Sequence, residues 1–162
     1  MKIGVISDTH VPIFAAQLPP KLLKKLDECD RVIHAGDFHA YSVYRELASR
    51  YNLTAVIGNR DEFPESEEIP ERQVIHVGGF KIGITHGFGP PKGVAKRVVR
   101  SWKDTPPDLV IFGHSHQAGM HEIDGFKLLN PGSPTDTLSS DRQTYAILEL
   151  DDEIKISIHD LG

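Results

Sequence analysis

Seven polar side chains that can bind a metal ion occur in short motifs spread along the chain. The motifs are Ser7-Asp8-Thr9-His10, Gly36-Asp37, Gly58-Asn59, His86-Gly87 and Gly113-His114-Ser115-His116. Carboxylate, amide oxygen and imidazole together suit borderline and hard divalent ions such as Mn²⁺, Fe²⁺, Zn²⁺ or Ni²⁺. A glycine or another small residue beside each motif leaves room where several backbones crowd a compact centre. The set therefore predicts a metal site.

The same residues favour a centre with two ions. A carboxylate such as Asp37 has two oxygens that can bridge a pair of ions, and His114 and His116 can point in different directions from a non-helical turn. Two divalent ions against two carboxylates leave a positive excess, which attracts a phosphate group. Ions about 4 Å apart can hold a bridging water and lower its pKa towards roughly 7. We therefore expect phosphoester hydrolysis through a metal-bridging hydroxide.

Each motif alone is a weak signal, and their common position gives the prediction its strength. Asp-x-His occurs often by chance, and a Gly-Asp pair after a strand is usually a turn or a helix cap. Here, however, every motif follows a predicted strand. In α/β sheets the loops beyond the carboxyl ends of the strands converge on one crevice, so residues distant in sequence meet there.

The elements that position these motifs can be read from hydrophobic periodicity. Strands are predicted at residues 2–7, 31–35, 53–57, 73–77, 80–85, 108–112, 121–123, 126–130, 143–150 and 154–159. A first helix starts near Pro19 or Pro20 and places Leu22, Leu23 and Leu26 on one face, and further helices are predicted at residues 41–49 and 94–102. Residues 61–72 are acidic and contain two prolines, which predicts a surface loop with little regular structure.

This order of elements predicts the α/β class, with β-α-β units first and antiparallel hairpins later. We expect a two-sheet β-sandwich flanked by helices, formed by residues 1–162 as a single domain, because 162 residues suit one compact core. The pairing order of the strands cannot be read from the sequence.

Composition limits the partners. A formal net charge of −5 argues against a broad basic face that grips nucleic acid, and no apolar run is long enough to cross a bilayer. The single cysteine, Cys29, and a first strand that begins directly after Met1 predict a cytoplasmic protein. The oligomeric state, a homo-oligomer included, stays open.

Taken in order, the five motifs resemble the calcineurin-like metallophosphoesterase superfamily, and Asn130-Pro131-Gly132-Ser133 resembles its small phosphodiesterases. The resemblance implies a small phosphodiester substrate and two divalent ions, chiefly Mn²⁺ or Ni²⁺. It assigns one ion to Asp8, His10, Asp37 and His116, and the other to Asp37, Asn59, His86 and His114, with Asp37 as the bridge. The expected catalytic residues are Asn59, Arg60 and His86.

Arg60 departs from the family pattern. Many members have a histidine after Gly-Asn that protonates the leaving group, whereas this chain reads Gly58-Asn59-Arg60-Asp61. A guanidinium stays protonated, so Arg60 cannot act as that acid, but it can hold a phosphate oxygen. The alternative is that Arg60 merely pairs with Asp61 or Glu62. Without leaving-group protonation, which adds about 100-fold or more, activated phosphodiesters are the expected substrates.

Three further histidines, His34, His76 and His159, lie within predicted strands and are interpreted as structural. Two more, His39 and His121, follow ligand motifs and are weaker candidates for substrate contact. For Ser133 a turn role is favoured over phosphate binding. We expect the loops around Phe14, Phe63 and Phe88 to select the leaving group.

Two other functions remain open. Leu18-Pro19-Pro20-Lys21, Phe80-Lys81-Ile82-Gly83 and Asn130-Pro131-Gly132-Ser133 also resemble the small scaffold subunit of the retromer coat, a binding protein whose phosphoesterase-like pocket is degraded. The complete ligand set favours an enzyme, because a scaffold has no physical need for seven polar groups around two cations. A metal-dependent nuclease would use the same site, but the negative charge counts against it.

Overall fold

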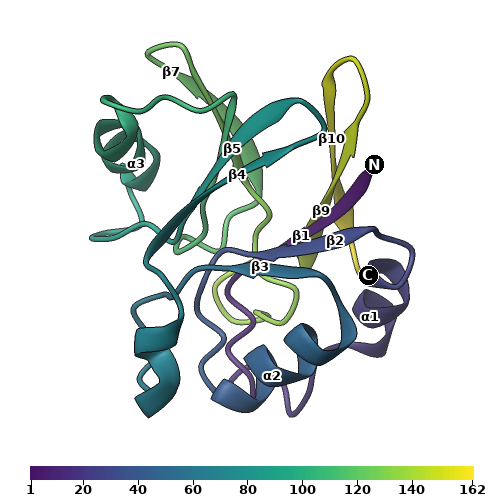
Figure 1. Cartoon of the computed structure of the whole chain (residues 1–162). Coiled ribbons are helices and arrows are strands. Elements are labelled where there is room, and N and C mark those ends of the chain that lie inside the picture. The colour runs from purple at the N-terminus through teal and green to yellow at the C-terminus, as the bar shows by residue number, and fades with distance from the viewer.

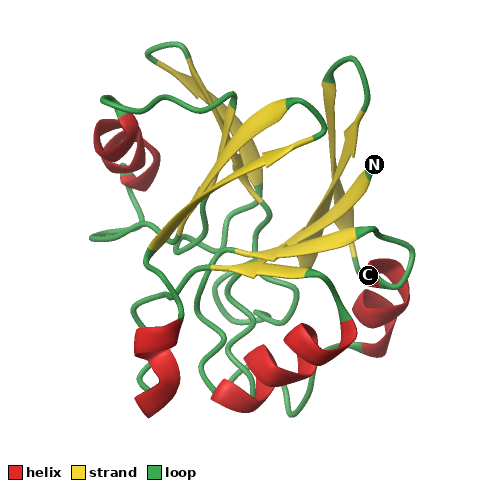
Figure 2. Cartoon of the chain, in the orientation of Figure 1, coloured by secondary structure: helices red, strands yellow, loops and turns green.

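The computed structural model describes residues 1–162 and contains two five-stranded sheets flanked by three α-helices (Figures 1 and 2). The strand order is β10-β9-β1-β2-β3 in the first sheet and β4-β5-β6-β8-β7 in the second. The strands are β1 (Lys2–Ile6), β2 (Arg31–His34), β3 (Leu53–Ala55), β4 (Arg72–Val77), β5 (Phe80–Thr85), β6 (Leu109–Ile111), β7 (Gly119–Ile123), β8 (Phe126–Asn130), β9 (Thr144–Leu150) and β10 (Ile154–Asp160). The α/β sandwich class is therefore confirmed.

The helices cover the outer faces of the two sheets (Figure 1). Helices α1 (Pro20–Leu26) and α2 (Tyr41–Arg50) connect β1 to β2 and β2 to β3, whose pairing is parallel. Their buried residues, Leu22, Leu26 and Leu47, join a core cluster with Ile6 and Val32 of the first sheet. Helix α3 (Val94–Trp102) packs on the second sheet in a separate cluster. Apolar spacing of three and four residues explains why each helix buries one face.

The inner faces of the two sheets form a shared core. Ile3 and Ile33 from the first sheet belong to the same buried cluster as Ile82, Ile84 and Ile111 from the second. Because the apolar side chains of β-strands alternate sides, one face of each strand can fill this space between the sheets.

Most predicted elements match the structure to within one or two residues, and the acidic segment at residues 61–72 is the main correction. It contains a 3₁₀-helix, η1 (Pro64–Glu68), and its last residue, Arg72, begins β4. Pro64 opens this helix, where a missing N–H costs nothing, and short 3₁₀ turns are common connectors. No helix is long and apolar enough to cross a membrane.

The carboxyl ends of the parallel strands in both sheets face the same end of the sandwich. Within the first sheet, the N–H of Asp8 donates to the carbonyl of Gly36 (2.9 Å). Within the second, the N–H of Gly113 donates to the carbonyl of His86 (3.0 Å). Between the sheets, the N–H of His114 donates to Asp8 Oδ2 (3.0 Å). These bonds hold the loops that follow strands of both sheets next to one another.

Candidate metal centre

All seven predicted ligands lie on loops that directly follow strands of the two sheets. Asp8 and His10 follow β1, Asp37 follows β2, and Asn59 follows β3. In the second sheet, His86 follows β5, whereas His114 and His116 follow β6. The structure brings these seven side chains together, as the convergence of strand ends predicts.

One group of close atoms surrounds His10. Its Nε2 lies 3.2 Å from His116 Nε2 and 3.4 Å from Asp37 Oδ2. His116 Nε2 in turn lies 3.4 Å from Asp8 Oδ1. Asp8, His10 and His116 offer ligand atoms that all lie within 4.8 Å of one another, which is compact enough for a single ion.

A second group surrounds His86. Its Nε2 lies 3.2 Å from Asp37 Oδ2 and 3.2 Å from Asn59 Oδ1. The same Asn59 oxygen lies 3.1 Å from His114 Nδ1. Asp37 Oδ2 therefore lies between the two groups, near His10 on one side and His86 on the other.

The hydrogen bonds of the histidine rings fit a metal-binding role. His86 Nδ1 donates to the carbonyl of Ala35 (2.7 Å), and His114 Nε2 donates to the carbonyl of Gly89 (2.5 Å). His116 Nδ1 donates to Asp136 Oδ2 (2.6 Å). Each bond occupies one ring nitrogen, so the other nitrogen faces the cluster and can bind an ion once it has lost any proton it carries, an arrangement that is characteristic of metal-bound histidines. The donor set therefore fits divalent ions.

The backbone at this end is unusually strained. Positive φ angles occur at Asp8 (55°), His10 (40°), Asp37 (62°), His114 (72°) and His116 (58°), although none of these residues is glycine. Such conformations cost of order 1–3 kcal/mol each and are found mainly at functional sites.

Two glycines allow the loops to approach one another. A Cβ atom at Gly58 would lie 2.1 Å from Asp37 Oδ1, and one at Gly113 would lie 1.9 Å from Ser7 Oγ and 2.6 Å from Asp8 Oδ2. Neither position has space for a larger residue. The expectation that small residues make room for the ligands is thus met at these two motifs.

In the cluster, the positive histidines and the negative carboxylates stabilise one another's charged forms. Burial opposes the ionised form of Asp37, but His86, the N–H of Arg60 and His10 outweigh it and lower the pKa of this carboxyl to about 2. Burial also opposes the charge on His86 and His116, yet the neighbouring carboxylates, with Asp8 foremost, raise the pKa of each ring to about 9. In the metal-free protein these two imidazolium groups neutralise the carboxylates, and a bound ion would replace their protons.

Two aspartates that support the site were not assigned this role from the sequence. Asp136 is fully buried and holds His116, as described above. Asp61 is also buried, and its carboxylate accepts backbone N–H bonds from Asp37 (2.9 Å), Gly58 (2.7 Å) and His39 (2.9 Å). It thereby ties the loops after β2 and β3 together. This contact replaces the alternative in which Asp61 pairs with the Arg60 side chain.

The other candidate residues have varied positions. The Arg60 side chain is exposed and lines the pocket over the cluster, and the backbone N–H of Arg60 donates to Asp37 Oδ1 (2.8 Å). His39 lines the same pocket, whereas His121 lies exposed on β7, where its ring neighbours Phe112. The hydroxyl of Ser133 is buried and donates to the carbonyl of Asp8 (2.7 Å), which is a structural role.

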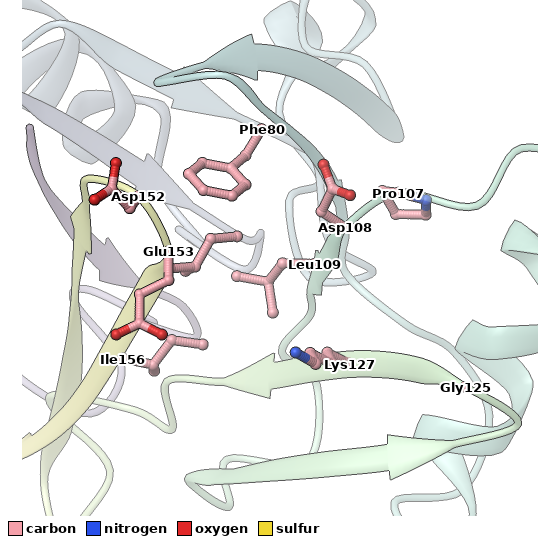
Figure 3. Close-up of a pocket in the computed structure, with 10 residues that line it drawn as sticks. Phe80, Pro107, Asp108, Leu109, Gly125, Lys127, Asp152, Glu153 and Ile156 are labelled. Carbon is pink, nitrogen blue, oxygen red and sulfur yellow. The ribbon is translucent and has the colours of Figure 1, made fainter.

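Two hollows of similar size lie at opposite ends of the sandwich. The pocket above the metal-ligand cluster has a volume of about 400 Å³. The other hollow, of about 470 Å³, lies where β5, β6, β8 and β10 begin, and Figure 3 shows Phe80, Leu109 and Ile156 around it with Asp152 and Glu153 at the rim. It contains no histidine, and both of these carboxylates belong to exposed residues. The residues that can bind a metal ion are therefore concentrated at the pocket above the metal-ligand cluster.

Comparison with known proteins agrees with this geometry. Residues 1–153 match the model of the calcineurin-like phosphoesterase superfamily domain. A "probable metallophosphoesterase" of Methanothermobacter thermautotrophicus is 32% identical over 94% of this chain and 88% of its own length. A phosphodiesterase of Methanocaldococcus jannaschii is 29% identical over 82% of this chain and 83% of its own length. The crystal structure of Vps29 from Chaetomium thermophilum has a TM-score of 0.79 at 22% identity and covers 99% of this chain and 93% of that one, a likeness of fold. The chain therefore belongs to the calcineurin-like phosphoesterase superfamily.

Proposed function

We propose that this protein is a metal-dependent phosphodiesterase that uses two divalent ions. The observation that carries the proposal is the position of Asp37, whose Oδ2 lies 3.4 Å from His10 Nε2 and 3.2 Å from His86 Nε2. A carboxylate between two groups of ligand atoms is the arrangement that a bridged pair of ions requires.

The proposed ligand assignment is the one that the family resemblance implies, and the close contacts within the cluster support it. Asp8, His10, Asp37 and His116 would hold one ion, and Asp37, Asn59, His86 and His114 would hold the other. Oxygen and imidazole ligands without any thiolate favour Mn²⁺, with Ni²⁺, Zn²⁺ and Fe²⁺ as alternatives. When bound, the ions would activate a water and polarise the phosphoryl oxygens.

The protein groups around the cluster bind and orient the substrate in this proposal. Arg60 lines the pocket with an exposed guanidinium, which suits a non-bridging phosphate oxygen. Asn59 Oδ1 lies 3.2 Å from His86 Nε2 and 3.1 Å from His114 Nδ1, so these three atoms are close enough to bind the same ion. Because Arg60 stays protonated, it cannot protonate a leaving group, and substrates with good leaving groups are favoured.

The family relationship supports phosphoester hydrolysis, and the phosphodiesterase of Methanocaldococcus jannaschii supports diesters within that class. The Arg60 side chain adds a positive charge at the pocket, which attracts the phosphate group of either kind of ester.

The test is hydrolysis of bis(4-nitrophenyl) phosphate and of 4-nitrophenyl phosphate by chelator-treated protein, before and after addition of Mn²⁺, Ni²⁺ or Zn²⁺. We expect no turnover without metal, and restored turnover with Mn²⁺ that is at least about tenfold faster for the diester, a difference of about 1.4 kcal/mol in barrier. Calorimetric titration with each metal measures binding separately.

Faster monoester hydrolysis would overturn the diester preference but not the phosphoesterase assignment. Failure to hydrolyse either ester while two ions are bound would overturn the enzymatic function, and it would favour the scaffold alternative. A single bound ion would contradict the bridging role of Asp37.

A further inference from the structure

We propose that the pocket above the metal-ligand cluster accepts phosphodiesters with an aryl ester group, and that Ile13 and Phe14 form the wall against which this group packs. The inference rests on the proposed phosphodiesterase function and defines its substrate class. It starts from an unusual feature of the pocket, an apolar surface beside a cluster of charged ligands.

Ile13 is the first part of this surface. This residue is 61% exposed although isoleucine is among the residues most often buried in proteins. It lines the same pocket as His10, Asp37 and Arg60. An exposed apolar residue is common on a protein surface, but one that faces a predicted metal centre offers apolar contact to whatever binds there.

Phe14 is the second part. Its ring centroid lies 4.9 Å from that of His10 and 5.8 Å from that of His116, with both pairs in a T-shaped arrangement. The ring is half-buried and lines the pocket, so part of it remains available to a ligand. Aromatic rings favour offset or T-shaped contact with another ring, which makes this wall better suited to an aryl group than to a short alkyl group.

The wall is held firmly against the ligand loops. The N–H groups of Ile13 and Phe14 both donate to the carbonyl of His10, at 2.7 and 3.0 Å. The N–H of His10 donates to the carbonyl of Asp37 (3.1 Å). The turn that carries the wall is thus bonded to two of the proposed metal ligands, so its position relative to those ligands is fixed.

The distribution of charge determines how a diester would lie. Arg60 follows Asn59, which belongs to the His86 group of ligand atoms, whereas Phe14 contacts His10 and His116 of the other group. A phosphate over the cluster can therefore turn a charged oxygen towards Arg60 and one ester group towards Ile13 and Phe14. The pocket volume of about 400 Å³ is in the range of small-molecule sites.

The test compares binding of phenylphosphonate, methylphosphonate and inorganic phosphate to Mn²⁺-loaded protein by calorimetry. These probes share the charged group and differ in the apolar substituent. We expect phenylphosphonate to bind about tenfold more tightly than methylphosphonate, as burial of part of a ring predicts. In Ile13→Ser this advantage should fall to about threefold or less, while the affinity for inorganic phosphate stays within about twofold of the wild type.

The matched control is Val74→Ser, which changes an exposed β-branched residue on the edge strand β4, outside the pocket. It should leave the phenyl advantage unchanged. A second variant, Phe14→Leu, should also reduce the advantage, and metal titration of this variant reveals any disturbance of the adjacent ligands.

Equal affinities for the phenyl and methyl probes in the wild type would overturn the proposed wall, as would an undiminished advantage in Ile13→Ser. Turnover of bis(4-nitrophenyl) phosphate is measured in parallel. Turnover without a phenyl advantage contradicts the aryl subsite alone, whereas absence of all turnover despite two bound ions contradicts the phosphodiesterase function itself.

Discussion

The two ends of the sandwich contain hollows of similar size but very different chemistry. The hollow at the strand starts has about 470 Å³ and the pocket at the strand ends about 400 Å³. At the first, Asp152 and Glu153 are exposed to solvent. In the cluster beneath the pocket at the strand ends, Asp8, Asp37 and His86 are each at most 3% exposed. A choice of the functional site by volume alone would therefore select the hollow at the strand starts, which lacks the metal-binding residues.

The two ends also differ in how strongly their structure opposes folding. Burying a charged group is costly unless it is paired, and backbone strain adds to that cost. The strand-end loops contain buried carboxylates and positive φ angles at Asp8, Asp37 and His116, whereas the lining of the other hollow has a positive φ angle only at a glycine, Gly125. Polar burial and strain in one place are the usual marks of a functional site.

Asp37→Asn is the change with the largest expected effect. We expect metal-dependent turnover of an aryl diester to fall by about 10³-fold or more, because an amide cannot bridge two ions with two anionic oxygens. The fold should persist, since the amide oxygen can still accept the N–H of Arg60. Turnover and circular dichroism of the metal-loaded variant measure both effects.

Glu153→Gln is the matched control at the opposite end of the sandwich. It removes an exposed carboxylate at the rim of the other hollow, and its turnover should remain within about twofold of the wild type. Full activity in Asp37→Asn would refute the bridging role, and a comparable loss in Glu153→Gln would refute the contrast between the two ends.

The sequence predicted much of this arrangement because the relevant signals are local. Alternating apolar residues and glycine-flanked polar motifs locate the strands and the residues that follow them, such as Asp8 and Asn59. Parallel strands then bring those residues together without any knowledge of the strand order. The order itself depends on which apolar faces pack best, which no short segment encodes.

The supporting carboxylates were beyond such reasoning. Asp136 is 20 residues from His116 and belongs to an irregular segment after β8, so no periodic pattern connects the two. A buried hydroxyl connects the Asp136 segment to the loop after β1, because Ser133 Oγ donates to the carbonyl of Asp8 and accepts the N–H of Asp136. Only the folded chain reveals this path. The acidic segment was misjudged for a similar reason, since η1 is too short to show helical periodicity.

Asp136→Asn tests whether this support is functional, with a smaller expected effect than Asp37→Asn. Asp136 Oδ1 accepts the N–H groups of Leu138 (2.8 Å) and Ser139 (3.0 Å), and Oδ2 accepts His116 Nδ1. An asparagine can satisfy only the first set, so the His116 ring loses its acceptor. We expect the affinity for one of the two ions to fall by about 10- to 100-fold.

Metal titration of Asp136→Asn by calorimetry measures this loss. The affinity for the second ion should be unchanged if His116 contacts only one of them. Asp141→Asn, which changes an exposed carboxylate of the same segment, is the control. Equal weakening of both ions would argue against the assignment of His116 to a single ion, and unchanged affinities would remove any role for Asp136 in metal binding.

The smallest predicted effect concerns His34, a buried ring near the metal end. The N–H of Gly36 donates to its Nδ1 (3.1 Å), so its proton is on Nε2, which donates to Thr9 Oγ1 (3.0 Å). Burial lowers the pKa of His34 to about 3, although the nearby Asp8 carboxylate raises it and His86 lowers it further. The folded state therefore keeps this ring neutral where the unfolded chain, with a pKa near 6.5, takes up a proton.

The contribution of His34 to stability is consequently complete above pH 6.5 and is lost as the pH falls towards 3, at up to about 1.4 kcal/mol per pH unit. In His34→Gln, chemical denaturation of metal-free protein between pH 6.5 and 4.5 should show a free energy of unfolding that depends less steeply on pH than in the wild type. Asp8 and Asp37 retain their carboxylates in both proteins, so the proton uptake of these carboxylates contributes to both pH dependences. Parallel pH dependences would mean that the ring is not held neutral, and the acid sensitivity of the metal end would then come from its ligands alone.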